Sequence, residues 1–341
     1  MPTWRQGQAV GEWRQIGGTA LESVPITVSV SGYTGPSSKV DAWSGFSIDT
    51  RTSSVYAVAN GGHHDYAGNE VDRIDLLANA PAWTEIRSST PMSQVVESQA
   101  YYNDGRPTSR HTYYGTIINE RTNRAMLING SQYGNGYGIS NVDGFNLSSR
   151  DWDAGGTYAK TPTTVTQVMG AAMAMDKATG DVYAFGWSSM SKYTAASNSW
   201  SSKDTAFNGQ SAASAVDTRR NRILLVGGPN NIRAIYDIAT GTMQAVTLGG
   251  SYGSTVGGQS DCMVYDPLQD AFLYRKDAAG AEVFRINAST LSVDMQPTSS
   301  AGAQIPLAPR GVWTRFMYVP ALKGVVYAPV YNGGMWFLRT N

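Results

Sequence analysis

Short apolar runs alternate with short polar turns along nearly the whole chain, and one arrangement of them returns six times. In four segments a small or apolar run ends at Asp, a polar turn follows, and a second apolar run comes next. These segments are GFSIDTRTSSVYAVANGG (45–62), GAAMAMDKATGDVYAFG (170–186), SAASAVDTRRNRILLVGG (211–228) and SDCMVYDPLQDAFLYRKD (260–277). Two further segments carry Asn119 or Pro320 at the turn, namely HTYYGTIINERTNRAMLINGS (111–131) and VWTRFMYVPALKGVVYAPVYNGG (312–334). The pattern predicts six β-hairpins.

Each hairpin is followed by a Gly-bearing loop, a third short apolar run, a turn, and a fourth run that often holds Trp. Four strands per unit, repeating every roughly 40 to 70 residues, are typical of propeller blades. Six such sheets stacked radially bury both faces of each sheet and leave only short edges. The sequence therefore predicts an all-β, six-bladed β-propeller with four-stranded antiparallel blades, forming a single domain over 1–341.

The predicted blades have approximate limits that follow the repeats. They are 41–86, 109–153, 165–202, 208–248, 257–295, and 310–341 plus 10–16. The sixth copy ends after three strands, whereas GEWRQI (11–16) near the other terminus has the Trp of an outer strand. We therefore expect the N-terminal strand to complete the last blade and close the ring.

Glycine pairs end the second strand in two copies, at Gly61-Gly62 and Gly227-Gly228, and outer turns read Asp75…Trp83 and Asn198…Trp200. In these residues, and over nearly its whole length, the chain resembles a kelch-type (galactose-oxidase-like) β-propeller. The resemblance implies the fold and leaves the activity open, because propellers host unrelated functions.

Composition narrows the classes of partner. The 26 Lys and Arg balance 26 Asp and Glu, which gives no electrostatic footprint for nucleic acid. No apolar run reaches the length of a membrane span, and the first residues lack the apolar core of a signal peptide. We therefore expect a cytoplasmic protein, or a virion-associated one released by lysis. The single cysteine, Cys262, excludes an internal disulfide. The sequence does not fix the oligomeric state.

The histidines are the strongest chemical signal. Two of the three, His63 and His64, stand side by side in NGGHHDYAGNE (60–70), and the third, His111, opens the second repeat. In a propeller the loops between second and third strands share one face with the connections between blades. We therefore expect all three imidazoles on one face. The alternation in HTYY further predicts that His111 and Tyr113 point the same way.

The residue types on this face suit a glycan, because aromatic rings pack on sugars and polar side chains bond their hydroxyls. Arginines on a neutral chain favour an acidic sugar. The predicted substrate-binding residues are His63, Asp65, Asn69, Glu70, Arg106, Tyr133, Tyr137, Trp187, Arg310 and Trp313. The partner is thus expected to be a polysaccharide or a surface glycan.

The first hypothesis for activity is cleavage of a uronate-containing glycan by β-elimination. Arg110 or Arg310 would neutralise the carboxylate, and His111 or His64 would take the C5 proton. Tyr113 or Tyr66 would protonate the leaving oxygen. In composition this face is similar to propeller lyases that act on ulvan, although those enzymes have seven blades.

Other functions stay open. The second hypothesis is a glycan- or receptor-binding propeller without catalysis, and the Gly/Ser/Thr/Asn-rich composition resembles phage tail-associated proteins. Glycoside hydrolysis would need two carboxylates, which Asp65, Glu70 and Asp104 could supply. A sialidase would show a repeated Asp-box pattern, which the sequence lacks. A copper radical oxidase needs a Tyr cross-linked to Cys, and Cys262 lies within a predicted inner strand. No cofactor is required by the pattern, but a divalent metal, zinc or manganese, would suit His63, His64, Asp65 and His111.

Overall fold

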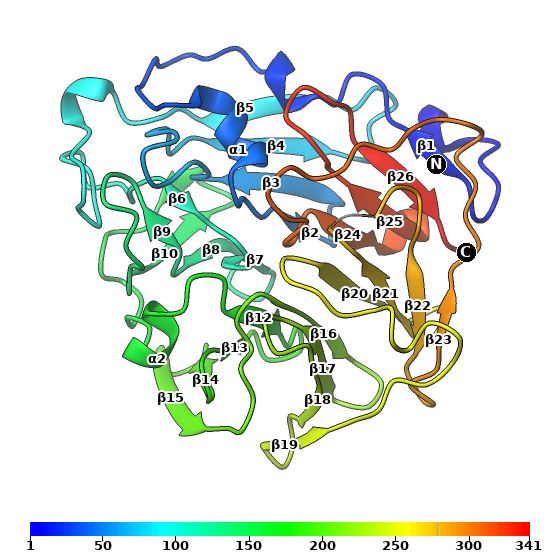
Figure 1. Cartoon of the computed structure of the whole chain (residues 1–341). Coiled ribbons are helices and arrows are strands. Elements are labelled where there is room, and N and C mark those ends of the chain that lie inside the picture. Colours follow the sequence, from blue (N-terminus) through cyan, green and yellow to red (C-terminus); the bar gives the residue numbers. More distant parts are fainter. Residues whose placement is uncertain (278) are drawn as a thin grey trace.

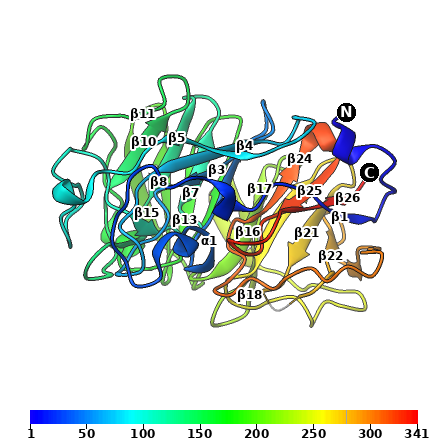
Figure 2. The same ribbon diagram turned by 90° about the horizontal axis from the view of Figure 1, so that it is seen from above.

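Six four-stranded antiparallel sheets surround a central axis in the computed structural model, which describes residues 1–277 and 279–341. In Figure 1 the colours follow one another around the centre, and Figure 2 shows the same sheets from the edge of the disc. The chain is therefore an all-β six-bladed propeller, as the repeats predict.

Five blades take all four strands from one repeat, and the sixth takes three from the last repeat and one from the N-terminal segment. Blades one to three consist of β2 (Ser47–Asp49), β3 (Ser54–Val58), β4 (Val71–Asp75) and β5 (Trp83–Arg87); β7 (Thr116–Asn119), β8 (Arg124–Ile128), β10 (Val142–Asn146) and β11 (Asp151–Trp152); and β12 (Ala172–Met175), β13 (Val182–Phe185), β14 (Ser189–Thr194) and β15 (Ser199–Asp204). Blades four to six consist of β16 (Ala212–Asp217), β17 (Arg222–Gly227), β18 (Ile232–Asp237) and β19 (Thr242–Ala245); β20 (Cys262–Asp266), β21 (Ala271–Arg275), β22 (Phe284–Asn287) and β23 (Val293–Met295); and β24 (Phe316–Val319), β25 (Gly324–Tyr327), β26 (Trp336–Arg339) and β1 (Trp13–Gln15).

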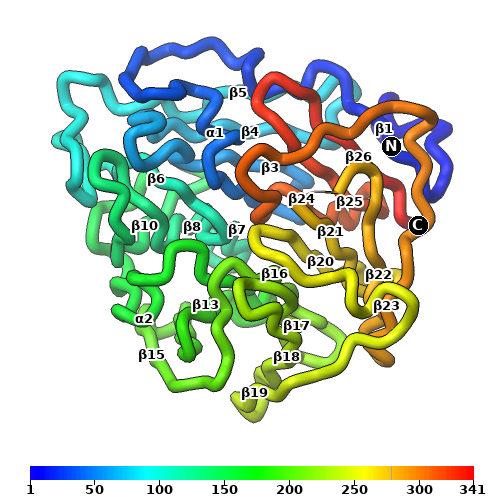
Figure 3. The backbone as a smooth tube through the Cα atoms, in the orientation of Figure 1, coloured from blue at the N-terminus to red at the C-terminus, as the bar shows by residue number. Residues whose placement is uncertain are grey.

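The ring is closed by chain ends that lie side by side, which Figure 3 shows clearly. Strand β1 pairs antiparallel with β26, with Trp13 opposite Leu338, so the N-terminal strand completes the sixth blade as predicted. Trp13 is buried, and its indole donates to the carbonyl of Ala281 in blade five at 2.9 Å. Closure therefore joins the last blade both to its own outer strand and to its neighbour.

The repeated acidic residue of each hairpin has a local structural role. A side-chain oxygen of Asp49, Asp176, Asp217 or Asp266 accepts a hydrogen bond from the backbone N–H two residues later, at 2.9 to 3.1 Å. Asn119 makes the same bond to Arg121. Such Asx turns fix the connection between the first and second strands of a blade, which explains why Asp or Asn recurs there.

A second repeated feature lies at the opposite end of the inner strands. One residue shortly before each inner strand has a positive φ, between 49° and 76°, and together these residues form what we call the collar: Trp43, Tyr113, Gly170, Ser211, Ser260 and Trp313. Backbone hydrogen bonds of 2.7 to 3.0 Å join four neighbouring pairs, Tyr113 to Trp43, Ser211 to Gly170, Ser260 to Ser211, and Trp313 to Ser260. The collar thus links the blades around one mouth of the central channel.

Two side chains fill the channel at the collar. Tyr114 of blade two extends to blade five, where its hydroxyl donates to the carbonyl of Asp261 at 2.7 Å. Its ring packs edge-on against buried Trp313, with ring centroids 5.0 Å apart. We call Tyr114 and Trp313 the plug, because together they cross the channel on the side of the collar.

Short helical segments lie in the connections. They are α1 (Ser38–Asp41), α2 (Thr163–Thr166), and the 3-10 turns η1 (Thr3–Arg5), η2 (Leu21–Ser23), η3 (Gly35–Ser37), η4 (Met92–Gln94) and η5 (Pro320–Leu322). Within 1–277 and 279–341, none of the helices has the length and apolar character that crossing a bilayer requires.

One expectation about the second blade is wrong. His111 does not open the inner strand, because that strand is β7 and begins at Thr116. His111 instead ends β6 (Arg110–His111), a two-residue strand that pairs with β9 (Ser131–Gln132) outside the blade. The left-handed backbone at Tyr113 separates this short ribbon from the blade proper.

We predict that closure depends strongly on Trp13. Replacing Trp13 by Ala removes a buried ring and should lower the free energy of unfolding by about 3–5 kcal/mol in urea denaturation. The matched change Trp187→Ala removes an indole that is 51% exposed and should cost less than about 1 kcal/mol. Equal losses for the two variants would contradict the assigned role of β1.

Candidate functional site

The three histidines meet on the collar face between blades one and two. The ring of His63 lies 5.8 Å from that of His64 and 5.9 Å from that of His111, measured between centroids. Gly62 makes this approach possible, since a Cβ on it would stand 2.0 Å from the backbone nitrogen of His111. The backbone N–H of Gly134 also donates to the carbonyl of His63, which fixes the loop. The fold therefore brings the three imidazoles together.

At the centre of the cluster lies an imidazole–carboxylate pair. Nε2 of His111 is 2.8 Å from Oδ2 of Asp65. Burial lowers the pKa of His111 below its ordinary value of 6.5, and the bond to Asp65 opposes this shift without cancelling it. The same hydrogen bond lowers the pKa of Asp65. The resting pair is thus a neutral imidazole beside a carboxylate.

Aromatic side chains from the collar cover this pair. The indole of Trp43 lies 4.9 Å from the His111 ring, and the phenol ring of Tyr113 lies 6.1 Å from it at a nearly perpendicular angle. Burial raises the pKa of Tyr113 to about 12, so the phenol keeps its proton at neutral pH. The rings of His111 and Tyr113 are thus neighbours, but not through the strand alternation from which a common direction was predicted, because β6 ends at His111 and Tyr113 has left-handed geometry.

A cation completes the surface. The guanidinium of Arg310 lies over the face of Trp43, 4.6 Å from the ring centroid. The Arg310 side chain is exposed, and none of the carboxylates in the described residues forms an ion pair with it. Trp43, His63, Tyr113 and Arg310 thus present an aromatic surface with one free positive charge; we call these four residues the top-face site.

The surface continues onto blade three. Met169 Sδ lies 3.9 Å from the Tyr113 hydroxyl, and Gln210 donates to the carbonyl of Met169 at 3.3 Å. Gln210 in turn accepts a hydrogen bond from the exposed indole of Trp187 at 2.8 Å. Trp187 therefore lies at the far end of the same face, where it can meet an extended ligand.

His64 has a separate set of neighbours. It stacks near the rings of Tyr33 and Tyr133, with centroids 5.8 and 6.0 Å away, and its Nε2 is 3.7 Å from Glu97. Tyr133 is buried against it, whereas Tyr33 is 87% exposed. His64 thus faces a rim of aromatic and acidic groups rather than the Asp65–His111 pair.

Arg110, predicted to neutralise a substrate carboxylate, is fully buried and forms an ion pair with Asp143. Its guanidinium also donates to the backbone carbonyls of Asn129 and Asn141 at 3.3 and 3.1 Å. These contacts hold the second blade to the β6–β9 ribbon and leave no face for a ligand. The catalytic assignment of Arg110 is therefore corrected to a structural one.

Tyr66 and Glu70 are likewise interior groups rather than ligand contacts. The Tyr66 hydroxyl donates to Glu70 Oε1 at 3.0 Å, and burial raises the pKa of Tyr66 far above its ordinary range. Lys39 Nζ lies 3.1 Å from Glu70 and 2.6 Å from Asp72, and all three side chains are almost fully buried. This cluster fastens α1, which leads to Trp43, to the strand that follows the histidine loop.

The remaining residues that were predicted to bind substrate lie either in the protein interior or at the edge of the collar face. Asn69 is buried and donates to Thr90 and to the carbonyl of Pro107. Arg106 pairs with Asp104 at 3.2 Å, away from the histidines, whereas Tyr137 is 71% exposed on its loop. Trp313 belongs to the plug, and its indole donates to the carbonyl of Arg310 at 2.5 Å. It is therefore not a stacking surface for sugar.

The predicted metal ligands lie near one another without forming a cage. Among residues 1–277 and 279–341, no group of three or more His, Cys, Asp or Glu side chains is arranged to hold a metal ion. Cys262 is buried and its thiol donates to the carbonyl of Phe316.

Sequence reasoning missed Trp43, which touches both His111 and Arg310. A signal was present: an aromatic residue stands three or four positions before the inner strand in three consecutive blades, as Trp43, Tyr113 and Trp313. A bulky residue in the left-handed region costs of order 1–3 kcal/mol, and such strain is concentrated at functional sites. The aromatic half of the collar is therefore the feature that marks this face.

Comparison with known proteins adds no family. No family model matches the chain, and no curated protein matches it in sequence. One solved structure, described as a nidogen/laminin complex, is similar over 74% of this chain and 78% of its own, with 10% identity and a TM-score of 0.46. Another, described as a mitotic checkpoint complex, is similar over 92% and 94%, with 11% identity and a TM-score of 0.49. At this level of similarity neither title bears on function.

We predict that His111 titrates below 6.5 in the folded protein, because burial disfavours its charged form. Asp65→Asn should lower this pKa further, whereas His63→Gln should raise it, since a nearby charged imidazole opposes protonation. NMR titration of the three imidazoles measures each shift. An unchanged His111 pKa in the Asp65→Asn variant would contradict the pairing.

The lowered pKa of His111 also determines how the free energy of unfolding changes with pH. The unfolded chain binds the His111 proton at a higher pH than the folded chain. The contribution of His111 to the free energy of unfolding is therefore complete above the ordinary pKa of 6.5 and is lost as the pH falls below it.

We predict that Lys39 is required for stability. Lys39→Met leaves two carboxylates buried without a cation and should cost about 3–5 kcal/mol in urea unfolding. The matched variant Lys177→Met breaks the pair with Glu120, in which Lys177 is 45% exposed, and should cost less than about 1 kcal/mol. Similar costs would show that the buried cluster does not depend on its lysine.

Proposed function

We propose that this propeller recognises an acidic polysaccharide at the top-face site. The observation that carries the proposal is the position of Arg310, an exposed guanidinium over Trp43, beside the histidine cluster and Tyr113. An aromatic surface accepts the apolar face of a sugar ring, and a guanidinium without a carboxylate partner accepts an acidic substituent.

The chemistry of the surface argues for a carboxylate on the sugar. Arg310 carries a positive charge, and the Asp65 carboxylate is turned inward to His111 at 2.8 Å. The groups that face outward are thus a cation, two aromatic rings and an imidazole. A neutral sugar would use the rings but would leave the guanidinium without its best partner.

The spread of the surface argues for a polymer. The path from Arg310 across Tyr113 and Met169 to Trp187 spans residues of blades six, one, two and three. A single sugar would cover only part of this path, whereas a chain of several sugars could lie along it.

Cleavage by β-elimination is the second candidate, and the Tyr113 phenol favours it. In this reaction Arg310 would bind the uronate carboxylate and the exposed imidazole of His63 would take the C5 proton. The C4–O bond then breaks, a C4–C5 double bond forms, and Tyr113, whose pKa is raised to about 12, gives its proton to the leaving oxygen. His111 and Asp65 would position His63 and Tyr113 without touching the sugar.

The kelch-like character of the repeats is also part of the proposal. It rests on the glycine pairs at Gly61-Gly62 and Gly227-Gly228, both of which have positive φ at the end of a second strand. The same position in blade two is filled by Asn129 and Gly130, also with positive φ. A phage tail-associated protein would be one setting for a glycan-binding propeller of this kind.

We predict that Arg310→Gln weakens binding of an acidic polymer about tenfold, because a charge-assisted pair is lost. Binding is measured by calorimetry on polygalacturonate, alginate and hyaluronan, with uncharged dextran for comparison. The same mixtures are followed by ultraviolet absorbance for new unsaturated uronate ends.

The control is Arg150→Gln, which removes an exposed arginine at a turn between third and fourth strands, on the opposite face. It should leave binding unchanged. Absence of binding to every polymer, or equal losses in both variants, would overturn the proposal. Binding without new absorbance would retain recognition and remove the lyase.

A further inference from the structure

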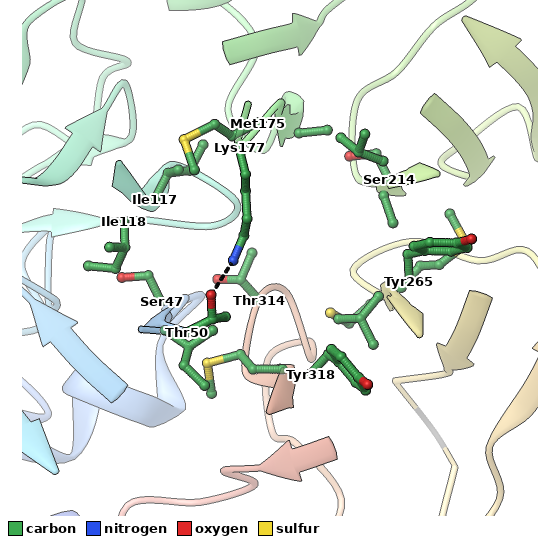
Figure 4. A pocket seen from close by; sticks show the side chains of 18 of the residues that line it. Ser47, Thr50, Ile117, Ile118, Met175, Lys177, Ser214, Tyr265, Thr314 and Tyr318 are labelled. Atoms are coloured by element: carbon green, nitrogen blue, oxygen red, sulfur yellow. Dashed lines mark hydrogen bonds between the residues drawn. The ribbon is translucent and has the colours of Figure 1, made fainter. Parts of the chain in front are cut away.

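A cavity lies on the propeller axis, on the other side of the plug from the top-face site. It has a volume of about 390 Å³ and is lined by the inner strand of every blade, β2, β7, β12, β16, β20 and β24. Figure 4 shows side chains from these strands around it. Residues of the hairpin turns, among them Thr50, Lys177 and Pro320, line its other end.

Most of the lining is apolar and adaptable. Four methionines contribute to it, together with aliphatic and aromatic side chains: Met173, Met175, Met263, Met317, Ile117, Val264 and Tyr318. Methionine has a flexible, polarisable side chain that adjusts to the shape of a bound molecule. A volume of this size lies within the range of small-molecule sites in proteins.

Three hydroxyls interrupt this apolar wall at the end nearest the collar. Ser47 and Thr116 are the first residues of β2 and β7, and Thr314 follows the collar residue Trp313. All three line the cavity, and their blades, the sixth, first and second, are consecutive. Among the residues that the structure describes, none of the three hydroxyls has a hydrogen-bond partner within the protein, and each oxygen is covered by its neighbours, so it meets a molecule in the cavity only after its side chain rotates.

Such unpartnered hydroxyls call for an explanation, because burying one without a bond costs of order 1–3 kcal/mol. Ser47 and Thr116 are more than nine-tenths buried. Ser214 provides the contrast: it lines the same cavity, but its hydroxyl donates to the carbonyl of Met173 at 3.0 Å. The free hydroxyls are thus gathered on one side and at one end.

At the end of the cavity formed by the hairpin turns, the positive charge of Lys177 is balanced by Glu120. Lys177 Nζ lies 2.9 Å from Thr50 Oγ1 and 3.0 Å from Glu120 Oε1, as Figure 4 shows for the first contact. The Lys177–Glu120 pair leaves no net charge for an ionic ligand. Recognition inside the cavity therefore depends on the hydroxyls and the apolar wall.

We propose that the axial cavity binds a small molecule with an apolar body and a neutral oxygen at one end. The hydroxyl or carbonyl oxygen bonds Ser47, Thr116 and Thr314 at the end nearest the collar, once these side chains rotate toward it, and the body packs against the methionines. The occupant has about nine to twenty non-hydrogen atoms, as the volume allows. This site is separate from the glycan surface and does not depend on it.

The test uses the full chain and 1-octanol as the probe, with octanoate and octylamine as probes that differ only in the polar end. Calorimetry should detect 1-octanol binding, and the octanol should raise the melting temperature. The double variant Thr116→Val/Thr314→Val should bind 1-octanol about ten- to a hundredfold more weakly, because two hydrogen bonds are lost.

Two further variants locate the site. Val216→Trp fills the cavity and should abolish binding, whereas Ser214→Ala removes a hydroxyl that is already bonded and should leave the affinity unchanged. The double valine variant should melt no lower than the unaltered chain without octanol, since the lost hydroxyls have no partner in the protein and their burial is costly.

Three results would overturn the proposal. One is absence of 1-octanol binding to the unaltered chain. Another is equal binding by the Val216→Trp or double valine variant. The third is tighter binding of octanoate or octylamine than of octanol, which would contradict a neutral polar end.

Discussion

The collar imposes the constraint on which both candidate sites depend. Six inner strands can converge on one axis only if the chain turns sharply before each of them, and a positive φ at every collar position makes that turn. Backbone hydrogen bonds in four of the six neighbouring collar pairs then fix how far apart those blades stand. Because these bonds involve main-chain atoms, the side chains at the collar are free to vary. Blades three, four and five carry glycine or serine there, and blades one, two and six carry the large rings of Trp43, Tyr113 and Trp313.

Because the large rings occupy only three consecutive blades, one side of the collar forms an aromatic surface and the other side does not. The strain of three aromatic residues in left-handed geometry is offset elsewhere, and the structure shows where. Arg315 is fully buried and donates to the carbonyls of Ser44 and Ala328, so that the segment bearing Trp43 is held to blade six. The Lys39 cluster holds the same segment to blade one. Buried charges of this kind contribute little net stability, but breaking one member is costly. Their effect is therefore to fix Trp43 against His111 rather than to strengthen the fold as a whole.

The repeats in the sequence were sufficient for the fold and for bringing the histidines together, because both follow from strand order. Asp49 and its counterparts mark each hairpin through a local bond, and local bonds leave a regular trace in sequence. Exposure does not. Arg110 and Arg310 are equally basic in the sequence, yet one is enclosed by the carbonyls of Asn129 and Asn141 and the other lies over Trp43. Only packing between repeats decides which arginine meets a ligand. The same holds for Tyr66 and Trp313, which the sequence places on the right face and the fold places inside it.

The plug decides how the two sites relate. Tyr114 and Trp313 span the axis, and their rings pack edge to face between the top-face site and the cavity. They therefore lie between a polymer on the collar face and a small molecule in the cavity. Trp313 nevertheless contacts both regions: its ring packs on Tyr113, 5.0 Å away, and the next residue, Thr314, lines the cavity. An occupant that bonds Thr314 would press on the same backbone that sets the Trp313 and Tyr113 rings. The sites are therefore separate in space but share one rigid element, so any coupling between them has to pass through the collar.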